Sequence, residues 1–593
     1  MGNEAVAWGA LAAGVSVACG YPGTPSTETL ETLAKINPGW VHVEWSVNEK
    51  SAAEVAVGAA YTGARALVTM KQVGLNVAAD PVMCVNYVGI KGGLVIYVAD
   101  DPGPISSQTE QDTRHFAQYA RIPVFDCSSP EEAFYMVQDA FAYSEKYGGP
   151  VILRSTTRVC HSCAPVEIPQ ISPPKGETAF EKGSQWVIFP RLSYINKQKL
   201  VAREPEIGRD FCGYPFNQRI GAGKTGIACG GVSYAYVQEA IEGREHLFQV
   251  LKIATPYPFP EDLALSFLKE TERVFVFEEL DPVIEDELIY LCGKNGIRAQ
   301  ISGKRDHSVA VAGELSAAAI GKILSAHGVC EAPPEPQPGA DLPPVPTRPP
   351  VLCAGCPHRA SFYAVKKACA GQSAIFCGDI GCYTLGNAPP LHMVDTCLCM
   401  GAGVTMAQGL FHSKIRDIPF AFIGDSTFFA SGINGVVNAL TNQAQLILIV
   451  LDNGTTAMTG NQSHPGMGKT ISGQKVAPVS IEKVLTALGV EHVQTVDPLE
   501  HKQAVAAVKT ALRQEGVRAI VFRSPCAALL KNTKPLKVDA GRCSGCRLCL
   551  RQLGCPALSF GPEDRAVIDA SLCNGCGLCR QICPQACIIQ EES

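Results

Sequence analysis

The sequence predicts a multidomain α/β protein that ends in a small, cysteine-rich α+β domain. The chain has 593 residues, several times the size of one compact core. Short β-rich runs such as RALVTM, GGLVIYVAD and QLILIVLDN alternate with helical stretches, which is typical of parallel sheets covered by helices. Eight cysteines stand in two nearly matching groups in the last tenth of the chain.

Composition restricts the classes of function. The chain is 46% apolar and 18% charged, which is enough to bury several cores. Its formal charge of -6 and the absence of a long basic run give no nucleic-acid face and no membrane-surface patch. No apolar run reaches the roughly 20 residues of a membrane span, and Glu4 stands where a secretory signal carries Lys or Arg. We therefore expect a cytoplasmic protein whose partners are small molecules or proteins.

Changes in composition divide the chain into six segments. Residues 166–215 show no clear period and are expected to form a connecting arm, and the proline-dense residues 329–350 predict an extended linker. The predicted segments are 1–165 (first α/β domain), 166–215 (arm), 216–328 (second α/β domain), 329–350 (linker), 351–533 (third α/β domain) and 535–593 (cysteine-rich domain).

The terminal cysteines have the spacing of iron–sulfur ligands. Each group reads C-x2-C-x2-C and is followed by a Cys-Pro pair, the pattern with which bacterial ferredoxins hold two 4Fe-4S clusters and exchange the fourth ligand between motifs. Zinc also binds CxxC pairs but leaves the third cysteine and the proline unexplained. The first group has five residues rather than three before its Cys-Pro, which lengthens a loop. The assigned ligands are Cys543, Cys546, Cys549 and Cys583 for the first cluster, and Cys573, Cys576, Cys579 and Cys555 for the second.

Two strand ends in the third α/β domain resemble a thiamine diphosphate motif. IGDS ends one β-rich run and LDN ends another, with 25 residues between Ser426 and Asp452. By resemblance to the motif that begins GDG and closes on Asn-Asn, Gly424 and Ser426 lie at the cofactor, and Mg2+ is held by Asp425, Asn453 and the Thr455 carbonyl. Mg2+ prefers such oxygen ligands together with phosphate oxygens. A helix opening near residues 432–434 could direct N–H groups to the same phosphates. Alone, the two ends could be ordinary turns.

Glu49 in the first domain resembles the glutamate that activates the cofactor in thiamine enzymes. It precedes a run of small residues, NEKSAAEVAVGAAYTG, that is typical of the helix following that glutamate. A glutamate at a helix start can also serve only as a cap or a dipole partner. In a poorly solvated cleft, Glu49 would stay partly protonated and hydrogen-bond the cofactor's aminopyrimidine.

These parts occur together in the 2-oxoacid:ferredoxin oxidoreductases. The segments GYPGTPSTE, MKQVGLNVAADP, EELDP, CAGCPHR, GDIGCYTLG and TGNQSHPG resemble the large α subunits of the indolepyruvate ferredoxin oxidoreductase family. The resemblance implies a transketolase C-terminal-like second domain. It also implies conversion of an aryl-2-oxo acid such as indolepyruvate, CoA and oxidised ferredoxin into the arylacetyl-CoA, CO2 and reduced ferredoxin.

The resemblance suggests further site residues and leaves several open. Thr24, Pro25 and Ser26 are expected beside cofactor and substrate, although YPGTPS alone is only a turn-rich loop. His464 could be a substrate or proton-transfer partner or merely structural, and Gln462 is equally open. Six further cysteines could form a metal or redox centre or be buried thiols: Cys353, Cys356, Cys377, Cys382, Cys397 and Cys399.

Substrate and partner expectations follow from what the sequence lacks. Pyruvate relatives hold the substrate carboxylate with an arginine near a strand end where this chain reads VADDP, so pyruvate is the less expected substrate. The alternatives are a pyruvate or branched-chain 2-oxoacid:ferredoxin oxidoreductase, or an electron-transfer subunit whose thiamine site has decayed. No domain is found for the role of the family's separate small β subunit. We therefore expect an α2β2 assembly with ferredoxin as acceptor.

Overall fold

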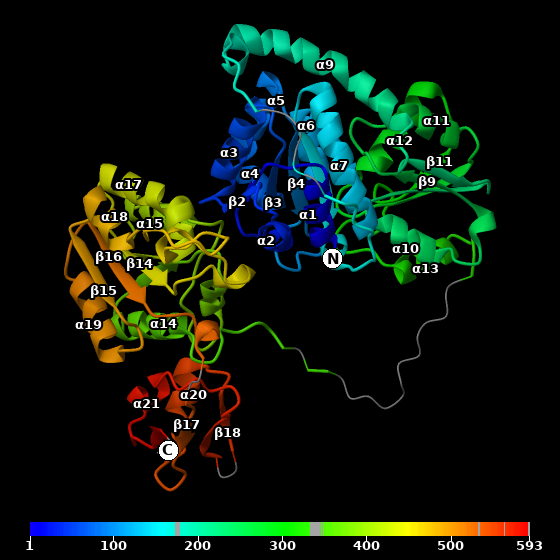
Figure 1. The fold of residues 1–593 in the computed structure, drawn as a ribbon. Helices are drawn as coiled ribbons and strands as arrows, with labels where there is room; N and C mark the ends of the chain where they lie inside the picture. Colours follow the sequence, from blue (N-terminus) through cyan, green and yellow to red (C-terminus); the bar gives the residue numbers. More distant parts are fainter. Residues whose placement is uncertain are drawn as a thin grey trace. The chain divides into compact units, whose positions relative to one another are not determined.

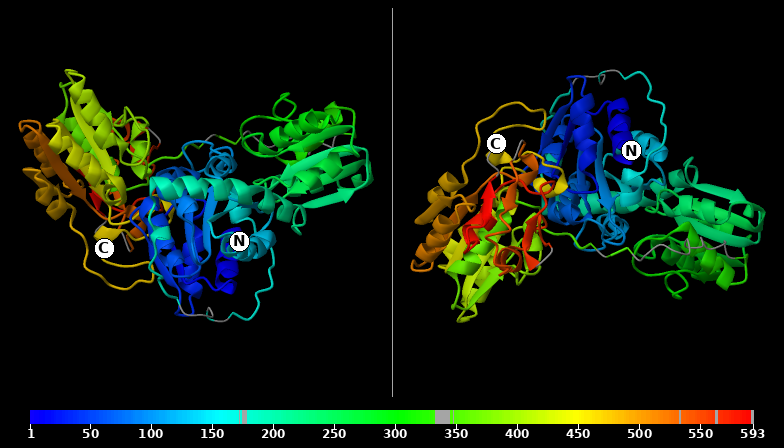
Figure 2. Two further views of the ribbon diagram at one scale, coloured as in Figure 1. Left: turned by 90° about the horizontal axis from the view of Figure 1, so that it is seen from above. Right: turned by 90° about the horizontal axis from the view of Figure 1, so that it is seen from below.

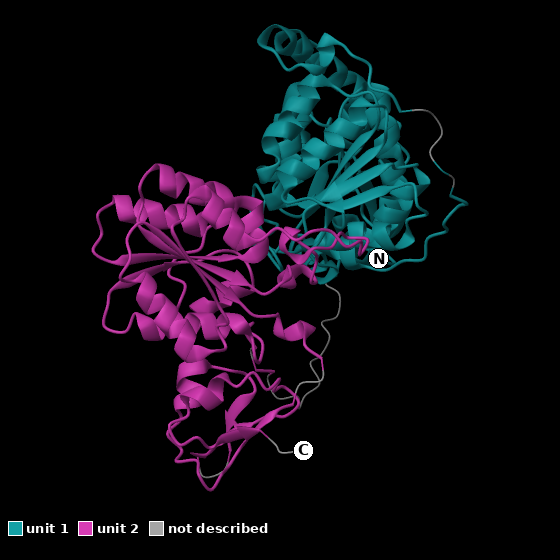
Figure 3. Cartoon of the chain, turned by 60° about the vertical axis from the view of Figure 1, so that its left-hand side comes forward, with its two compact units in different colours: residues 1–342 teal, residues 343–593 magenta. Residues whose placement is uncertain are grey.

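The chain folds into two compact units, residues 1–342 and 343–593, which are described separately (Figure 3). The computed structural model describes residues 1–171, 173, 178–331, 345–346, 348–531, 534–561 and 564–590. Most of the predicted linker at 329–350 lies outside these residues. No helix in the described part of the chain is both long and apolar enough to cross a membrane.

The first sheet of unit 1 has six parallel strands in the order β2-β1-β3-β4-β6-β5. Every residue of β4 is buried, as expected for a parallel sheet covered on both faces. Because all strands run the same way, their carboxyl ends share one edge. The strands are β1 (Val17–Gly20), β2 (His42–Trp45), β3 (Ala66–Lys71), β4 (Leu94–Asp100), β5 (Val124–Asp126) and β6 (Val151–Thr156).

Helices cover both faces of this sheet. α3 turns Ala52, Ala56 and Ala60 inward, and these small side chains let the helix lie close to the strands. Figure 1 shows α3 and α5 on one side of the sheet and the packed pair α1 and α7 on the other. The helices are α1 (Gly2–Ala12), α2 (Thr27–Ile36), α3 (Glu49–Tyr61), α4 (Gln72–Val77), α5 (Ala79–Val88), α6 (Thr113–Ala120), α7 (Pro130–Tyr147) and α8 (Thr157–His161).

A long helix, α9 (Pro190–Cys212), lies in the segment where the sequence showed no period. Only four of its residues are buried, all from Leu200 onward, so no apolar stripe marks its first half. This explains why periodicity did not reveal it. The short 3-10 turn Ser184–Trp186 precedes it.

A second sheet in unit 1 has the order β11-β10-β8-β9-β7, with only β7 antiparallel. Figure 2 shows this sheet and its helices in teal and green. Buried ion pairs join it to the first sheet's domain, including Arg114 with Glu278 at 2.6 Å. Its strands are β7 (Gln218–Gly221), β8 (Thr225–Gly230), β9 (Phe248–Ile253), β10 (Arg273–Phe277) and β11 (Gln300–Ser302), and its helices are α10 (Ser233–Ala240), α11 (Glu261–Leu268), α12 (Val283–Asn295) and α13 (Ala317–Ala326).

Unit 2 contains a third parallel sheet, in the order β12-β13-β14-β16-β15. Residues of α14 and α19 share one apolar core with it, and residues of α15, α17 and α18 share the other. Its elements are α14 (Pro357–Ala368), β12 (Ala374–Cys377), α15 (Ala402–His412), β13 (Ile418–Gly424), α16 (Asp425–Thr427), a π-helical stretch (Phe428–Gly432), α17 (Ile433–Thr441), β14 (Leu446–Asp452), α18 (Ile481–Leu488), β15 (His492–Val496), α19 (His501–Ala511) and β16 (Val517–Arg523).

The terminal cysteines lie in a small α+β domain within unit 2. Two antiparallel strand pairs, β17 with β20 and β18 with β19, accompany two short helices. The elements are β17 (Leu536–Val538), α20 (Leu548–Leu553), β18 (Leu558–Phe560), β19 (Ala566–Ile568), α21 (Leu578–Ile582) and β20 (Ile588–Gln590). The predicted fold class, parallel α/β domains with an α+β tail, is thereby confirmed.

Candidate functional site

Three neighbouring strand ends gather the predicted residues of unit 1. Glu49 begins α3 after β2, the loop of residues 24–26 follows β1, and Lys71 ends β3. β1 pairs with both β2 and β3. Since parallel strands end at one edge of the sheet, these groups share that edge. No motif or spacing in the sequence marked Lys71 as a site residue.

Glu49 has the surroundings of an acid–base group rather than a cap. The side chain of Asn48 caps α3, accepting a hydrogen bond from Ser51 N at 2.9 Å, so capping does not need Glu49. Burial raises the pKa of Glu49, and the charge of Lys71 partly opposes this. A Cβ atom on Gly74 would lie 2.6 Å from Glu49 Oε1, so only glycine at position 74 leaves the carboxyl group its place.

The loop of residues 24–26 is held by its own polar groups. Ser26 is buried, and its hydroxyl is used within the loop. This loop therefore has a fixed shape before any ligand binds. Three hydrogen bonds fix it: Ser26 Oγ to Gly23 O (2.9 Å), Asn3 Nδ2 to Pro25 O (2.6 Å) and Ser106 Oγ to Thr24 O (3.2 Å).

Asp425 links the ends of β13 and β14 in unit 2. Its buried carboxylate accepts hydrogen bonds from the backbone N–H groups of Ser426 (2.8 Å), Asn453 (3.2 Å) and Gly454 (2.9 Å). Burial raises the pKa of the neighbouring Asp452, and the negative charge of Asp425 contributes to this. The buried Asp425 carboxylate, held between two strand ends, suits a hard divalent cation, whereas Asp452 is paired with Arg523.

Asn453 is oriented by its neighbours on both ends of the amide. Its Oδ1 accepts from Thr455 N at 3.0 Å, and its Nδ2 lies 3.2 Å from Nε2 of His358. Burial lowers the pKa of His358 to about 4, so the imidazole is neutral and can accept this hydrogen bond. His358 stands in the CAGCPHR segment, but the sequence analysis assigned it no role.

His464 lies against the predicted magnesium ligand. Its Nε2 is 3.2 Å from Asp425 Oδ2, a contact without hydrogen-bond geometry, and its Nδ1 accepts from Gly466 N at 3.2 Å. The ring stacks on Phe429 with centroids 5.9 Å apart. Gln462 hydrogen-bonds within its own loop. The structure thus places His464 at the site without assigning it a proton-transfer role.

The helix after β13 begins earlier than the sequence analysis expected. The helical backbone starts at Asp425 and continues through the π-helical stretch into α17, so the amides of residues 432–434 lie inside it. A carboxylate in the first helical turn is favourable, which allows the strand to lead directly into the helix. The N–H groups at the helix start are therefore those just after Gly424.

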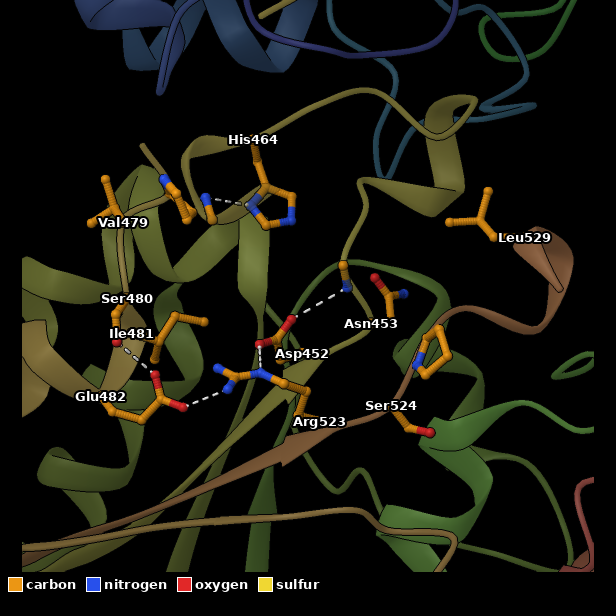
Figure 4. A pocket seen from close by; sticks show the side chains of 14 residues that line it. Asp452, Asn453, His464, Val479, Ser480, Ile481, Glu482, Arg523, Ser524 and Leu529 are labelled. Atoms are coloured by element: carbon orange, nitrogen blue, oxygen red, sulfur yellow. Dashed lines mark hydrogen bonds and ion pairs between the residues drawn. The ribbon is translucent and has the colours of Figure 1, made fainter. Parts of the chain in front are cut away.

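A cavity of about 490 Å³ opens beside these groups (Figure 4). Its lining includes Asn453, His464, Glu482 and Arg523. Arg523 is paired with both Asp452 and Glu482 at 2.7 Å. Its charge is thus neutralised by carboxylates of this chain and is not available for a substrate carboxylate.

Two further cavities in the α+β domain collect the terminal cysteines. Each holds three thiols from one motif and the fourth from the other, which is the exchange that two cubanes require. The chemistry of these donor sets fits 4Fe-4S clusters. One cavity is lined by Cys543, Cys546, Cys549 and Cys583, and the other by Cys573, Cys576, Cys579 and Cys555.

A third group of thiols lies in the third α/β domain. Cys353 and Cys356 stand on one turn before α14, and burial raises the pKa of Cys382 to about 11, with a contribution from Cys353 and Cys526. The backbone N–H of Cys526 donates to Asn453 O at 3.0 Å, which puts this thiol group next to the Asp425 site. In the sequence, Cys382 was grouped with nearby cysteines such as Cys377 and Cys397 as candidate ligands, and Cys526 was not singled out.

Arg359 joins the α+β domain to the third α/β domain. It is 4% exposed and donates to the carbonyls of Leu352 (2.6 Å), Leu553 (2.6 Å) and Gly554 (2.9 Å). Gly554 directly precedes Cys555, a predicted ligand of the second cluster. One buried side chain therefore bridges the second cluster's ligand loop and the turn that carries Cys353.

The buried arginines of the first domain are also paired. Arg154 contacts Asp100 at 2.7 Å and Asp126 at 2.8 Å, and Arg114 contacts Asp112 and Glu278 at 2.6 Å. Each guanidinium charge is thus balanced by two carboxylates of this chain, although Arg154 Nη2 has no hydrogen-bond partner among the described residues.

Three family models match the chain. Residues 8–208 match "Pyruvate flavodoxin/ferredoxin oxidoreductase, thiamine diP-bdg", residues 379–522 match "Thiamine pyrophosphate enzyme, C-terminal TPP binding domain", and residues 566–589 match "4Fe-4S binding domain". These ranges contain Glu49, the Asp425 site and the second cysteine motif.

Curated relatives match over the whole length. The indolepyruvate oxidoreductase subunit IorA of Methanothermobacter thermautotrophicus is 39% identical over 100% of this chain and 97% of its own, and that of Pyrococcus abyssi is 40% identical over 98% and 95%. A 2-oxoglutarate synthase subunit KorA of Archaeoglobus fulgidus is 25% identical over 47% of this chain and 86% of its own. With such identity over its full length, the chain belongs to the indolepyruvate oxidoreductase subunit IorA family.

Proposed function

We propose that this chain is the catalytic subunit of an indolepyruvate:ferredoxin oxidoreductase, which converts aryl-2-oxo acids and CoA to arylacetyl-CoA and CO2. The observation that carries the proposal is the combination, in one chain of this family, of the oxygen-ligand site at Asp425 with two four-thiol cavities. A substrate panel tests it. The assembled enzyme should show a higher kcat/KM for indolepyruvate than for pyruvate or 2-oxoglutarate, and a preference for pyruvate would contradict the proposal.

Each site residue has a defined task in this reaction. Bound thiamine diphosphate supplies the carbon that adds to the 2-oxo group and takes up the electrons left by CO2. Glu49, whose pKa burial raises, holds a proton for the cofactor's aminopyrimidine. Asp425, Asn453 and the Thr455 carbonyl provide oxygens for Mg2+. Gly424 and Ser426 begin the helix whose N–H groups suit the diphosphate.

Lys71 is the candidate partner for the substrate carboxylate. Its charge acts on Glu49, and its side chain runs along Gly23 of the loop that carries residues 24–26. Its hydrogen bonds to Ser106 O and Ser107 Oγ are long, at 3.4 Å each. Burial lowers the pKa of Lys71, so a carboxylate partner would stabilise its charged form.

Lys71→Met should raise the KM for indolepyruvate about tenfold to hundredfold, because a charge-assisted hydrogen bond contributes about 1.5–3 kcal/mol. Lys71→Arg keeps the charge and serves as the matched control. Binding of indole-3-lactate, which has the carboxylate but does not react, should weaken in parallel. Unchanged KM and unchanged binding of the lactate would rule out this role.

Electrons would leave through unit 2. Cys526 hydrogen-bonds Asn453 of the Asp425 site, Cys382 lies near Cys353 and Cys526, and Cys356 shares a turn with Cys353. We infer that these four thiols hold a further iron–sulfur centre. Arg359 connects the turn of Cys353 with the ligand loop of Cys555. This arrangement supports a route from the cofactor through the third thiol group to the second cluster, and onward to ferredoxin.

Iron analysis distinguishes three centres from two. With three cubanes, the protein should contain about twelve iron atoms per chain, and Cys526→Ser should contain about four fewer while keeping both terminal clusters. Cys163→Ser removes an exposed thiol outside all three groups and is the control. About eight iron atoms in the unaltered protein would contradict the third centre.

The proposal also covers the partner proteins and the cellular compartment. The IorA family name implies a second subunit, and we propose an α2β2 assembly that uses ferredoxin as acceptor. None of the described cysteines forms a disulfide, which suits the reducing cytoplasm that we expect. Decay of the thiamine site is not favoured, because Asp425 and Asn453 are both buried and the Asp425 carboxylate accepts a hydrogen bond from Asn453 N. Extraction of the purified protein should yield thiamine diphosphate, and its absence would support decay.

A further inference from the structure

A fifth cysteine lines the cavity of the first cluster. Cys587 is 3% exposed and borders the same cavity as the four assigned ligands. Its Sγ lies 3.3 Å from Sγ of Cys583, within sulfur hydrogen-bonding distance, and it also hydrogen-bonds Cys543. The family pattern gives this thiol no role.

The duplicated motif provides an internal comparison. Cys587 directly precedes β20, and its carbonyl accepts from Asp539 N at 2.8 Å. In the other half, Ala557 directly precedes β18, and its carbonyl accepts from Asp569 N at 2.9 Å. Ala557 borders the second cavity and is equally buried. The same backbone position thus carries a thiol at one cluster and a methyl group at the other.

In the other half, alanine is sufficient to pack the equivalent position, so the shared backbone geometry does not by itself call for a thiol. A buried cysteine often acts only as a small hydrophobic residue. Here, however, the sulfur faces a cavity built for iron and contacts two of its ligands.

We propose that Cys587 is a reserve ligand of the first cluster and replaces Cys583 when the bond from Cys583 to iron breaks. In this exchange the Cys587 thiol gives its proton to the departing Cys583 thiolate, and the new Cys587 thiolate binds the same iron. Charge and electron count do not change, so no oxidant or reductant is needed. The inference rests on the proposed cluster assignment.

Iron and acid-labile sulfide in the anaerobically purified complete enzyme test the inference. Cys583→Ala should keep the iron content of the unaltered protein, because Cys587 takes over. Cys555→Ala, the matched change at the second cluster, should lose about four iron atoms per chain because Ala557 offers no thiol. The double variant Cys583→Ala with Cys587→Ala should also lose about four.

Two results would overturn the reserve role. One is equal iron loss in Cys583→Ala and Cys555→Ala, and the other is full iron content in the double variant. Full iron content in Cys555→Ala would instead refute the cluster assignment itself, and the inference with it. Cys583→Ser, which keeps nearly the size of the cysteine side chain, is measured in parallel as a control for folding. In every variant that alters a ligand of the first cluster, the electron paramagnetic resonance signal of the second cluster must persist.

Discussion

Glu49→Gln should lower turnover of the assembled enzyme about 10²- to 10⁴-fold, the range that positioned acid–base groups typically contribute. The amide keeps the size of the side chain but cannot exchange a proton with the aminopyrimidine. Cap and helix should persist because Asn48, not Glu49, caps α3. Thiamine diphosphate and iron contents should therefore remain close to those of the unaltered protein. Steady-state kinetics with indolepyruvate measure the effect.

A matched control lies on the same helix. Glu54 is exposed and pairs with Lys50, so Glu54→Gln changes the charge of α3 without touching the buried site. Its turnover should be nearly normal. Near-normal turnover in Glu49→Gln as well would remove Glu49 from the catalytic role.

Asp425→Ala should strongly reduce both Mg2+ and thiamine diphosphate in the purified protein. The methyl group cannot coordinate the cation, and three backbone N–H groups lose their acceptor. Turnover should recover in part at high cofactor concentration. Cofactor analysis and a titration of turnover with added thiamine diphosphate measure both effects.

A second variant separates charge from hydrogen bonding. Asp425→Asn keeps an oxygen acceptor for the N–H groups but removes the negative charge. It should bind the cofactor more weakly than the unaltered protein and better than Asp425→Ala. Full cofactor occupancy of Asp425→Ala at ordinary concentration would contradict the magnesium assignment.

Much of the fold and part of the site were predictable because they depend on local sequence patterns, namely apolar runs and residue spacing. Continuous apolar runs marked the buried strands, such as β4 and β14, and polar residues just after such runs marked the strand ends where Asp425 and Asn453 lie. The cysteine spacing predicted which thiols share a cavity, because the exchange of fourth ligands is a property of the motif.

Other site residues depend on contacts between distant segments. His358 reaches Asn453 across 95 positions, and Arg359 reaches Gly554 across 195. Lys71 became a candidate only when its strand end was placed beside those of β1 and β2. No spacing rule in a single sequence encodes such contacts. The same reason explains why Cys526 was missed as a neighbour of Cys382.

The most direct test of the proposed reaction is an anaerobic assay with indolepyruvate, CoA and a low-potential acceptor, without and with the partner β subunit. The chain alone should contain thiamine diphosphate and iron–sulfur clusters yet show little CoA-dependent turnover. Adding the β subunit should yield arylacetyl-CoA, CO2 and reduced acceptor in a fixed ratio to one another. Full activity of the chain alone would contradict the two-subunit proposal. An assembled, cofactor-loaded enzyme that leaves indolepyruvate unchanged would contradict the proposed function itself.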